Sequence, residues 1–371
     1  MSKAVGLISI SPGEMIQQMM ECFGWNQTDL AEITGLSGKT VSLLVQDKQN
    51  ISLDIATLLG ETFEKTPEFW INMFNNYKLK TRDEKAVSKE KLTKEKAIMH
   101  KYMPVAEMKK KGWFINDVST IDGIKKEYER LFSQSTFPVV QYKKAVVNMA
   151  ARQTKDDTEY TPYYRKTWFT FAQLESKKIE NPCSYDSKKL GKIAKKLYSY
   201  TIMLDGEKQV LQDLNRAGVN FFVLSHLSKT YLDGAAFIND ELPFIVYTGR
   251  YDRVDNFWFV LAHEIAHILH HYSYLSNPIL DDLDGVAKDE IENEADEFAG
   301  VYLRQQDVIN SGRRYGGYIT EERLNGLSEK TGVSVPVALG MLQHAGIVQW
   351  RQFARFREKV MDKIPSEYIK G

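Results

Sequence analysis

The chain has 371 residues, 43% of them hydrophobic, which predicts a soluble globular protein of two or three domains. Its 49 Lys and Arg balance its 49 Asp and Glu, so net charge indicates no partner, and its two cysteines, Cys22 and Cys183, argue against a disulfide framework and favour a reducing cytoplasm. Because no basic segment with a long apolar run opens the chain, and no apolar run approaches the ~18 residues of a membrane span, we expect a cytoplasmic protein with neither a signal peptide nor a membrane partner.

Residues 1–80 predict a helical bundle that contains a helix-turn-helix. Ser11, Pro12 and Glu14 are typical of a helix start. Two more helices, beginning near 26 and 37, flank Gly35, which supplies a tight turn. In this motif the start of the second helix reaches base edges in DNA, and the start of the first lies near a phosphate. The candidate DNA-binding residues are therefore Gln27, Ser37, Lys39, Thr40 and Ser42.

The charge of residues 1–80 is unusual for a DNA-binding domain. Six basic residues stand against nine acidic ones, whereas phosphate contacts normally require a basic surface. The alternative is a retained helical bundle that serves dimerisation, giving a homodimer, or capture of a substrate.

Residues 81–215 predict a basic linker followed by a helical middle region. The stretch from Lys78 to Lys111 holds twelve Lys and Arg against five Asp and Glu, which either supplies phosphate contacts or forms a solvated helical linker. Apolar residues then recur with helical spacing, and aromatic residues such as Trp168 and Phe171 are expected in a core rather than in a ligand pocket.

Residues 216–371 predict a catalytic domain with a small sheet. Residues 218–224, 235–238 and 243–247 read as strands, so the expected fold class is mainly α with a small β-sheet (α+β). A sheet beside the helix that follows would offer an edge along which an extended peptide could bind.

The segment that follows the strands contains His263-Glu264-x-x-His267. Residues four apart on a helix share one face, with roughly 5–6 Å between their Cβ atoms, so the two imidazoles can hold one zinc ion. Glu264 is then placed to act as a general base on a water that takes the fourth metal position. The alternative is a core helix whose polar groups are satisfied structurally.

A third ligand is expected among the six acids of residues 289–299. Four residues define the buried stripe of that helix: Ile291, Ala295, Phe298 and Tyr302. At about 100° per residue, Glu294 lies roughly 70° and Glu292 roughly 90° from the centre of this stripe. The helical phase therefore does not decide which of the two is the third ligand. Asp296 follows Glu292 by one turn and could orient a ligand imidazole. We therefore select Glu292, with Glu294 as the second candidate.

The amino-terminal pattern Trp25-x-Gln27-x-x-Leu30-Ala31 … Gly35-Leu36-Ser37 resembles the XRE group and HigA-type antitoxins. Residues 233–237, the His-Glu-x-x-His motif and Glu292-x-x-Ala295-Asp296 together resemble the ImmA/IrrE family of metallopeptidases, in which such a domain often precedes the peptidase. The resemblance implies zinc, ligands at His263, His267 and Glu292, a base at Glu264, and a repressor or antitoxin as the protein substrate. A transcriptional regulator or antitoxin with a structural or inactive metal site is the alternative, and the intact Glu264 favours the peptidase. The candidates for a transition-state stabiliser are Tyr231, Arg250, Tyr251, His226 and Tyr272.

Overall fold

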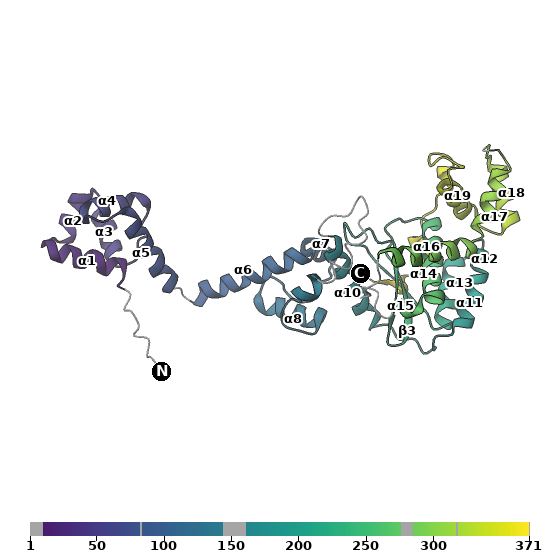
Figure 1. Cartoon of the computed structure of the whole chain (residues 1–371), viewed down its shortest axis with the longest axis horizontal. Helices are drawn as coiled ribbons and strands as arrows, with labels where there is room; N and C mark the ends of the chain where they lie inside the picture. The colour runs from purple at the N-terminus through teal and green to yellow at the C-terminus, as the bar shows by residue number, and fades with distance from the viewer. Residues whose placement is uncertain (1–9, 82–83, 144–160, 276–284, 317, 371) are drawn as a thin grey trace. The chain divides into compact units, whose positions relative to one another are not determined.

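The computed structural model describes residues 10–81, 84–143, 161–275, 285–316 and 318–370 (Figure 1). The chain forms two compact units, Met1–Thr93 and Lys94–Gly371. The described residues are mainly helical with one four-stranded sheet, which confirms the predicted fold class. Among the described helices, none is long and apolar enough to cross a lipid bilayer.

The first unit is a bundle of short helices around one apolar core. Its helices are α1 (Pro12–Phe23), α2 (Gln27–Thr34), α3 (Gly38–Val45), α4 (Leu53–Phe63) and α5 (Pro67–Lys80). Side chains cap the helix starts: Ser11 and Glu14 form a capping box on α1, and Asn26 and Asp29 form one on α2. Gly35 takes a left-handed conformation (φ 71°) between α2 and α3, as the turn of a helix-turn-helix requires.

Helix α6 (Glu84–Tyr102) contains the boundary between the two units, within the residues predicted as a basic linker. Its lysines, such as Lys85, Lys89 and Lys94, are exposed, and its apolar residues become buried only near its end, at Met99 and Tyr102. Most of the helix therefore has no apolar face to pack.

Helices before the sheet form the first part of the second unit. They are α7 (Val105–Lys110), α8 (Ile121–Phe132), α10 (Thr161–Ser176), α11 (Ser187–Lys195), α12 (Leu197–Tyr200) and α13 (Gly206–Arg216). Trp168 is fully buried, and Phe171 packs on Trp113 with 4.6 Å between ring centroids. The aromatic residues of this region thus lie in a core.

The sheet has the order β2-β3-β1-β4, with strands β1 (Asn220–Leu224), β2 (Gly234–Asn239), β3 (Leu242–Tyr247) and β4 (Ile369–Lys370). β3 and β4 run parallel to β1, and β2 pairs antiparallel with β3, with Ala236 opposite Ile245. All five residues of β1 are buried, as expected of a central strand. β2 lies at one edge of the sheet and packs against α14 (Val254–His270).

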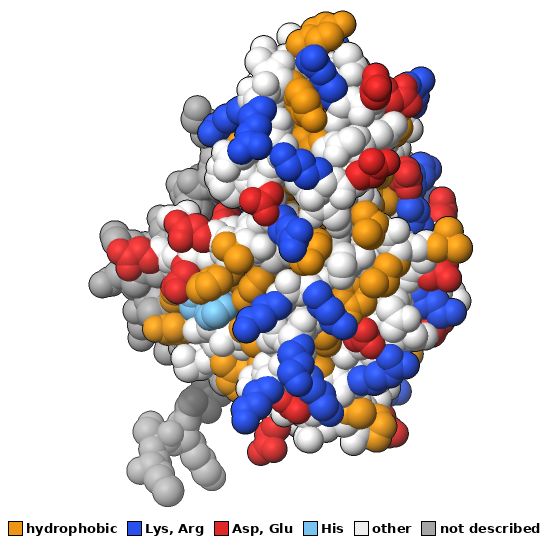
Figure 2. Space-filling model, turned by 90° about the vertical axis from the view of Figure 1, so that its right-hand side faces the viewer, with side chains coloured by type: hydrophobic (Ala, Val, Ile, Leu, Met, Phe, Trp, Pro, Cys, Tyr) orange, Lys and Arg blue, Asp and Glu red, His pale blue; other side chains and the backbone are white. Residues whose placement is uncertain are grey.

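Helices after the sheet complete the unit: α14, α15 (Tyr272–Leu275), α16 (Gly285–Tyr302), α17 (Gln305–Arg313), α18 (Glu321–Thr331) and α19 (Val335–His344), followed by short 3₁₀ turns at Ala354–Phe356, Met361–Lys363 and Ser366–Tyr368. α14 is the central element, because α16, α19 and the sheet all pack on it. The face of this unit in Figure 2 carries Lys, Arg, Asp and Glu side chains interspersed with small apolar areas.

Candidate metal centre

Helix α14 combines a buried apolar surface with the polar side chains of the His-Glu-x-x-His motif. Phe257, Trp258 and Ile265 are fully buried, which fixes the helix against the sheet and α19. His263 and His267 lie one turn apart, and their Nε2 atoms are 2.9 Å from each other. The spacing read from the sequence therefore does bring both imidazoles to one point.

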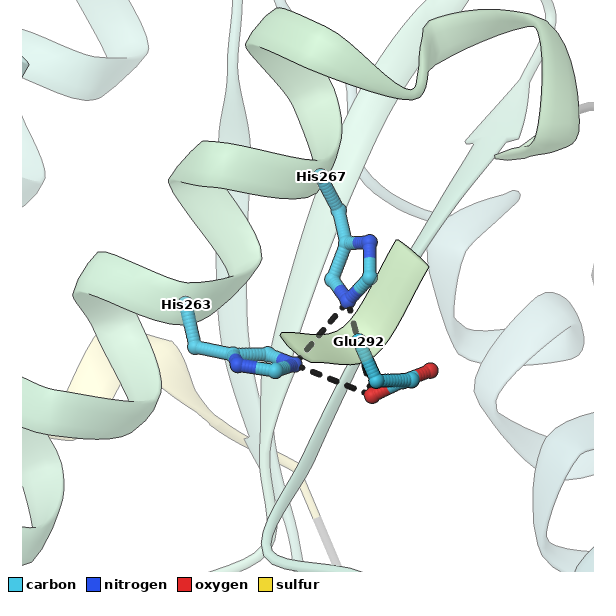
Figure 3. A group of neighbouring side chains, drawn as sticks. All are labelled: His263, His267 and Glu292. Atoms are coloured by element: carbon cyan, nitrogen blue, oxygen red, sulfur yellow. Dashed lines mark hydrogen bonds and ion pairs between the residues drawn. The ribbon is translucent and has the colours of Figure 1, made fainter. Parts of the chain in front are cut away.

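Helix α16 contributes a carboxylate to the same point (Figure 3). Glu292 Oε2 lies 3.3 Å from His263 Nε2 and 3.7 Å from His267 Nε2. Ligand atoms at tetrahedral angles and about 2.0–2.2 Å from a zinc ion lie roughly 3.3–3.6 Å apart. The two distances to Glu292 are close to this range, and the two imidazole nitrogens, at 2.9 Å, lie somewhat closer together. The two histidines predicted from their spacing, and the glutamate predicted from the position of Asp296, thus converge on one small space.

The hydrogen-bond partners of His263 explain why this space suits a cation. His263 Nδ1 lies 2.7 Å from Asp296 Oδ1. Since a carboxylate only accepts hydrogen bonds, the neutral ring donates through Nδ1 and keeps the Nε2 lone pair. That lone pair faces a carboxylate oxygen and the second imidazole nitrogen. Three acceptor atoms that face one another in this way can bind zinc. Because they repel one another, the arrangement is unfavourable unless a cation or a proton lies between them.

Protonation is the alternative to a metal at His263. Burial of the ring lowers its pKa, but hydrogen bonds to Asp296 and Glu292 and the charge of Glu264 outweigh burial and raise the pKa of His263 to about 10. Without a metal ion, the His263 ring therefore holds a proton that zinc would have to displace.

Glu264 follows the ligand candidate His263 on α14 and is only 6% exposed. Burial raises the pKa of its carboxyl, while the nearby His263 and His267 and the backbone N–H of Ala236 lower it. A carboxylate whose pKa is raised is better matched to accepting a proton near neutral pH. The Ala236 N–H belongs to the edge strand β2, so this strand borders the site directly.

Gly234 allows β2 to approach α14 closely. A Cβ there would lie 2.5 Å from Val260 Cγ1 and 3.0 Å from Glu264 Oε1. We expect Gly234→Ala to destabilise the protein by about 1–3 kcal/mol and to displace the edge strand from Glu264. Urea denaturation checks this, with Gly326→Ala as the control, because an added Cβ meets nothing within 4 Å in that exposed helix. Equal stability of Gly234→Ala and wild type would contradict the predicted close contact.

The second ligand candidate, Glu294, lies outside this group. Its Oε2 is 3.2 Å from His271 Nε2, and His271 Nδ1 in turn lies 3.1 Å from His267 Nδ1. His270 instead contacts Tyr302 OH at 2.8 Å and stacks on Phe298. His271 follows His267 by four residues, the spacing that places its ring beside the ligand imidazole.

The five candidate stabilisers fall into separate surroundings. The guanidinium of Arg250 packs over the rings of Tyr231 and Tyr251 and pairs with Asp233 at 3.4 Å. Tyr272 stacks on Tyr185 and donates to the carbonyl of Glu241. His226 is half-buried, and burial lowers its pKa. Arg250 is thus joined to the residue preceding Gly234 at the border of the site.

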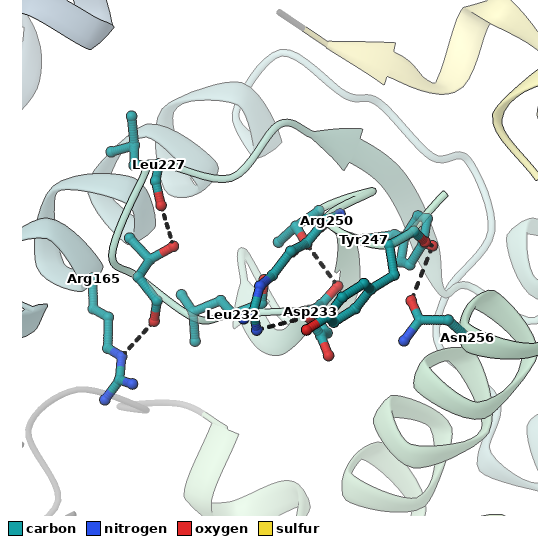
Figure 4. A network of polar contacts seen from close by, with 10 residues as sticks. Arg165, Leu227, Leu232, Asp233, Tyr247, Arg250 and Asn256 are labelled. Atoms are coloured by element: carbon teal, nitrogen blue, oxygen red, sulfur yellow. Dashed lines mark hydrogen bonds and ion pairs between the residues drawn. The ribbon is translucent and has the colours of Figure 1, made fainter. Parts of the chain in front are cut away.

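The loop before β2 is anchored by polar contacts (Figure 4). Arg165 of α10 donates to the carbonyl of Thr230 at 2.7 Å, and the Thr248 hydroxyl donates to the carbonyl of Leu232 at 2.8 Å. Glu107 of α7 accepts from the backbone N–H of Ser228 at 3.0 Å. The helical middle region therefore positions the loop that leads into the edge strand.

The predicted DNA-binding residues lie on or beside α2 and α3. Gln27, Ser37 and Lys39 are exposed, and Thr40 and Ser42 are partly exposed. Ser37 caps α3 by accepting from the Thr40 N–H at 3.1 Å, and Ser42 accepts from the Gln46 amide at 3.1 Å. The hydroxyl groups thus have structural roles in the helix, while Lys39 is the basic residue of this set.

Comparison with known families and proteins found two similarities. Residues 215–343 match the profile of the Peptidase_M78 family, described as an IrrE N-terminal-like domain. The chain is also 36% identical over 64 residues to an uncharacterized HTH-type transcriptional regulator of Haemophilus influenzae, an overlap that covers 17% of this chain and 60% of that protein. No solved structure matches. Residues 215–343 are therefore similar to the IrrE N-terminal-like domain of the M78 peptidases, in a chain whose first unit has the helix-turn-helix arrangement.

Proposed function

We propose that this protein is a cytoplasmic zinc-dependent endopeptidase that cleaves a regulatory protein, a repressor or an antitoxin. The observation that carries the proposal is the convergence of His263 Nε2, His267 Nε2 and a Glu292 oxygen, with the buried Glu264 next to His263 in the same helix. The M78 match supports the same reading. The test compares wild type with Glu264→Gln in cells that also express the regulators encoded beside this gene.

His263, His267 and Glu292 would hold the zinc ion, which supplies Lewis acidity that lowers the pKa of a water and polarises a peptide carbonyl. Glu264 accepts a proton from the attacking water and passes it to the leaving amine. Asp296 fixes the tautomer of His263, so that its lone pair faces the metal position.

The edge strand β2 is the proposed binding surface for the peptide. It lies at the edge of the sheet and begins with Gly234, Ala235 and Ala236, which have small side chains or none. An extended substrate can add to such an edge through main-chain hydrogen bonds. Because the Ala236 N–H reaches Glu264, a peptide along this edge would pass the catalytic carboxylate.

The helix-turn-helix domain is proposed to deliver the peptidase to DNA or to a DNA-bound regulator. The name of the Haemophilus relative supports a role in transcription regulation. The acidic balance of residues 1–80 instead favours protein capture or a homodimer through this domain. Binding to duplex DNA distinguishes the two.

For DNA binding we expect Lys39→Glu to weaken affinity for a duplex from the gene's own upstream region by about tenfold, because the start of α3 would face DNA. Lys65→Glu is the control, since it makes the same charge change at an exposed position between α4 and α5. Fluorescence anisotropy at fixed salt measures both. Equal effects of the two substitutions, or no binding by wild type, would favour the protein-capture alternative.

A further inference from the structure

The ligand His267 makes a hydrogen bond on the side of its ring that faces away from the metal position. His267 Nδ1 lies 3.1 Å from His271 Nδ1, and His271 Nε2 lies 3.2 Å from Glu294 Oε2. His267 is 8% exposed and His271 4%, so neither ring can exchange these contacts readily for water.

The chemistry of the three groups sets the direction of both hydrogen bonds. The Glu294 carboxylate can only accept, so the neutral His271 ring donates to it through Nε2. His271 then keeps a lone pair at Nδ1 and can only accept there. His267 must therefore donate through Nδ1, which leaves its Nε2 lone pair directed at His263 and Glu292.

We propose that His271 and Glu294 are positioning residues that fix the tautomer and orientation of the ligand His267 and thereby raise the affinity of the site for zinc. This inference rests on the zinc centre of the proposed function. It gives Glu294 a role other than ligation. Each ligand imidazole is then oriented by a carboxylate: Asp296 orients His263 directly, and Glu294 orients His267 through the intervening His271 ring.

The placement of the relay residues follows from the two helices. His263 and His267 lie in α14, and His271 is the residue that caps its end, so the three rings follow one another at four-residue spacing. Glu292, Glu294 and Asp296 all lie in α16, which packs against α14. α16 therefore supplies one ligand and two orienting carboxylates from a single helix.

The test is the zinc dissociation constant of each purified full-length variant, measured by competition with a chromophoric chelator. Orienting partners of metal ligands typically contribute 10–100-fold in affinity, so we expect His271→Leu to weaken zinc binding by about that factor. Glu294→Gln is expected to weaken it by about tenfold. His271→Asn should recover most of the loss, because its amide oxygen can accept from His267 Nδ1.

A double substitution separates orientation from simple charge. In the His271→Asn background no ring links Glu294 to His267, so adding Glu294→Gln should cause no further loss. If Glu294 acted only through its charge, the second substitution would weaken zinc binding as much as it does in wild type, and the relay would be disproved.

Two control variants match the changes made. His270→Leu removes a neighbouring imidazole that contacts Tyr302, and Glu297→Gln removes an equal charge from an exposed position on α16; both should leave zinc affinity unchanged. If His271→Leu fails to fold, judged by thermal melting without metal, the exposed Glu294→Gln still decides the matter. Wild type that binds no zinc would overturn the proposed function, whereas tight binding by wild type and equally tight binding by both relay variants would overturn the relay alone.

Discussion

Replacing Glu264 by Gln is expected to abolish proteolysis while zinc stays bound. The amide cannot accept a proton from the attacking water, and loss of a general base costs about 10²–10⁴-fold in rate. Glu264 is not one of the three convergent ligand residues, so the metal should be retained. In cells that express neighbouring regulators, one of these proteins should disappear with wild type and persist with Glu264→Gln.

Glu297→Gln is the matched control for this experiment, because it makes the same chemical change at an exposed position. Zinc content of each purified variant, measured by elemental analysis, shows whether the centre is intact. Equal survival of every regulator with wild type and with Glu264→Gln would contradict the peptidase and favour a regulator with an inactive metal site.

Removal of a proposed ligand is expected to have the second large effect. Purified wild type should carry about one zinc ion per chain, and His263→Ala and Glu292→Ala should lose most of it, because two donors cannot hold the ion as three do. Glu294→Ala should still fill at saturating zinc, because Glu294 contacts His271 and not the ligand group. Unchanged zinc in the first two variants would remove the ligand assignment, and loss in Glu294→Ala alone would make Glu294 the ligand.

Much of the site could be predicted from the sequence, because the positions of its residues depend on the geometry of single helices. The four-residue spacing of His263 and His267 is a helical repeat, and the phase of α16 limited the third ligand to Glu292 or Glu294. Asp296 decided between the two, and in the structure it does contact His263. Each of these steps needed only the geometry of one helix.

Long-range features could not be predicted in the same way. β1 pairs with β4, which places Val223 opposite Ile369, and no pattern in either segment of the sequence indicates this pairing. The approach of β2 to Glu264 depends on Gly234, which in the sequence resembles any turn glycine. His271 and Glu294 meet only because α14 and α16 pack together, so their contact was absent from the sequence interpretation.

The DNA-binding residues show a different limit. The helix-turn-helix was predicted from caps and the Gly35 turn, which are local signals. Affinity for DNA depends instead on the charge of a whole surface. The acidic residues 1–80 disfavour binding to phosphates and the basic α6 favours it, so the local signals of the helix-turn-helix do not predict the affinity.

Anomalous diffraction at the zinc absorption edge, from crystals of the zinc-loaded protein, tests the metal centre most directly. We predict one peak about 2.0–2.2 Å from the Nε2 atoms of His263 and His267 and from a carboxylate oxygen of Glu292, with solvent at the fourth position. A peak distant from these atoms, or a fourth position filled by a protein side chain, would contradict the hydrolytic centre.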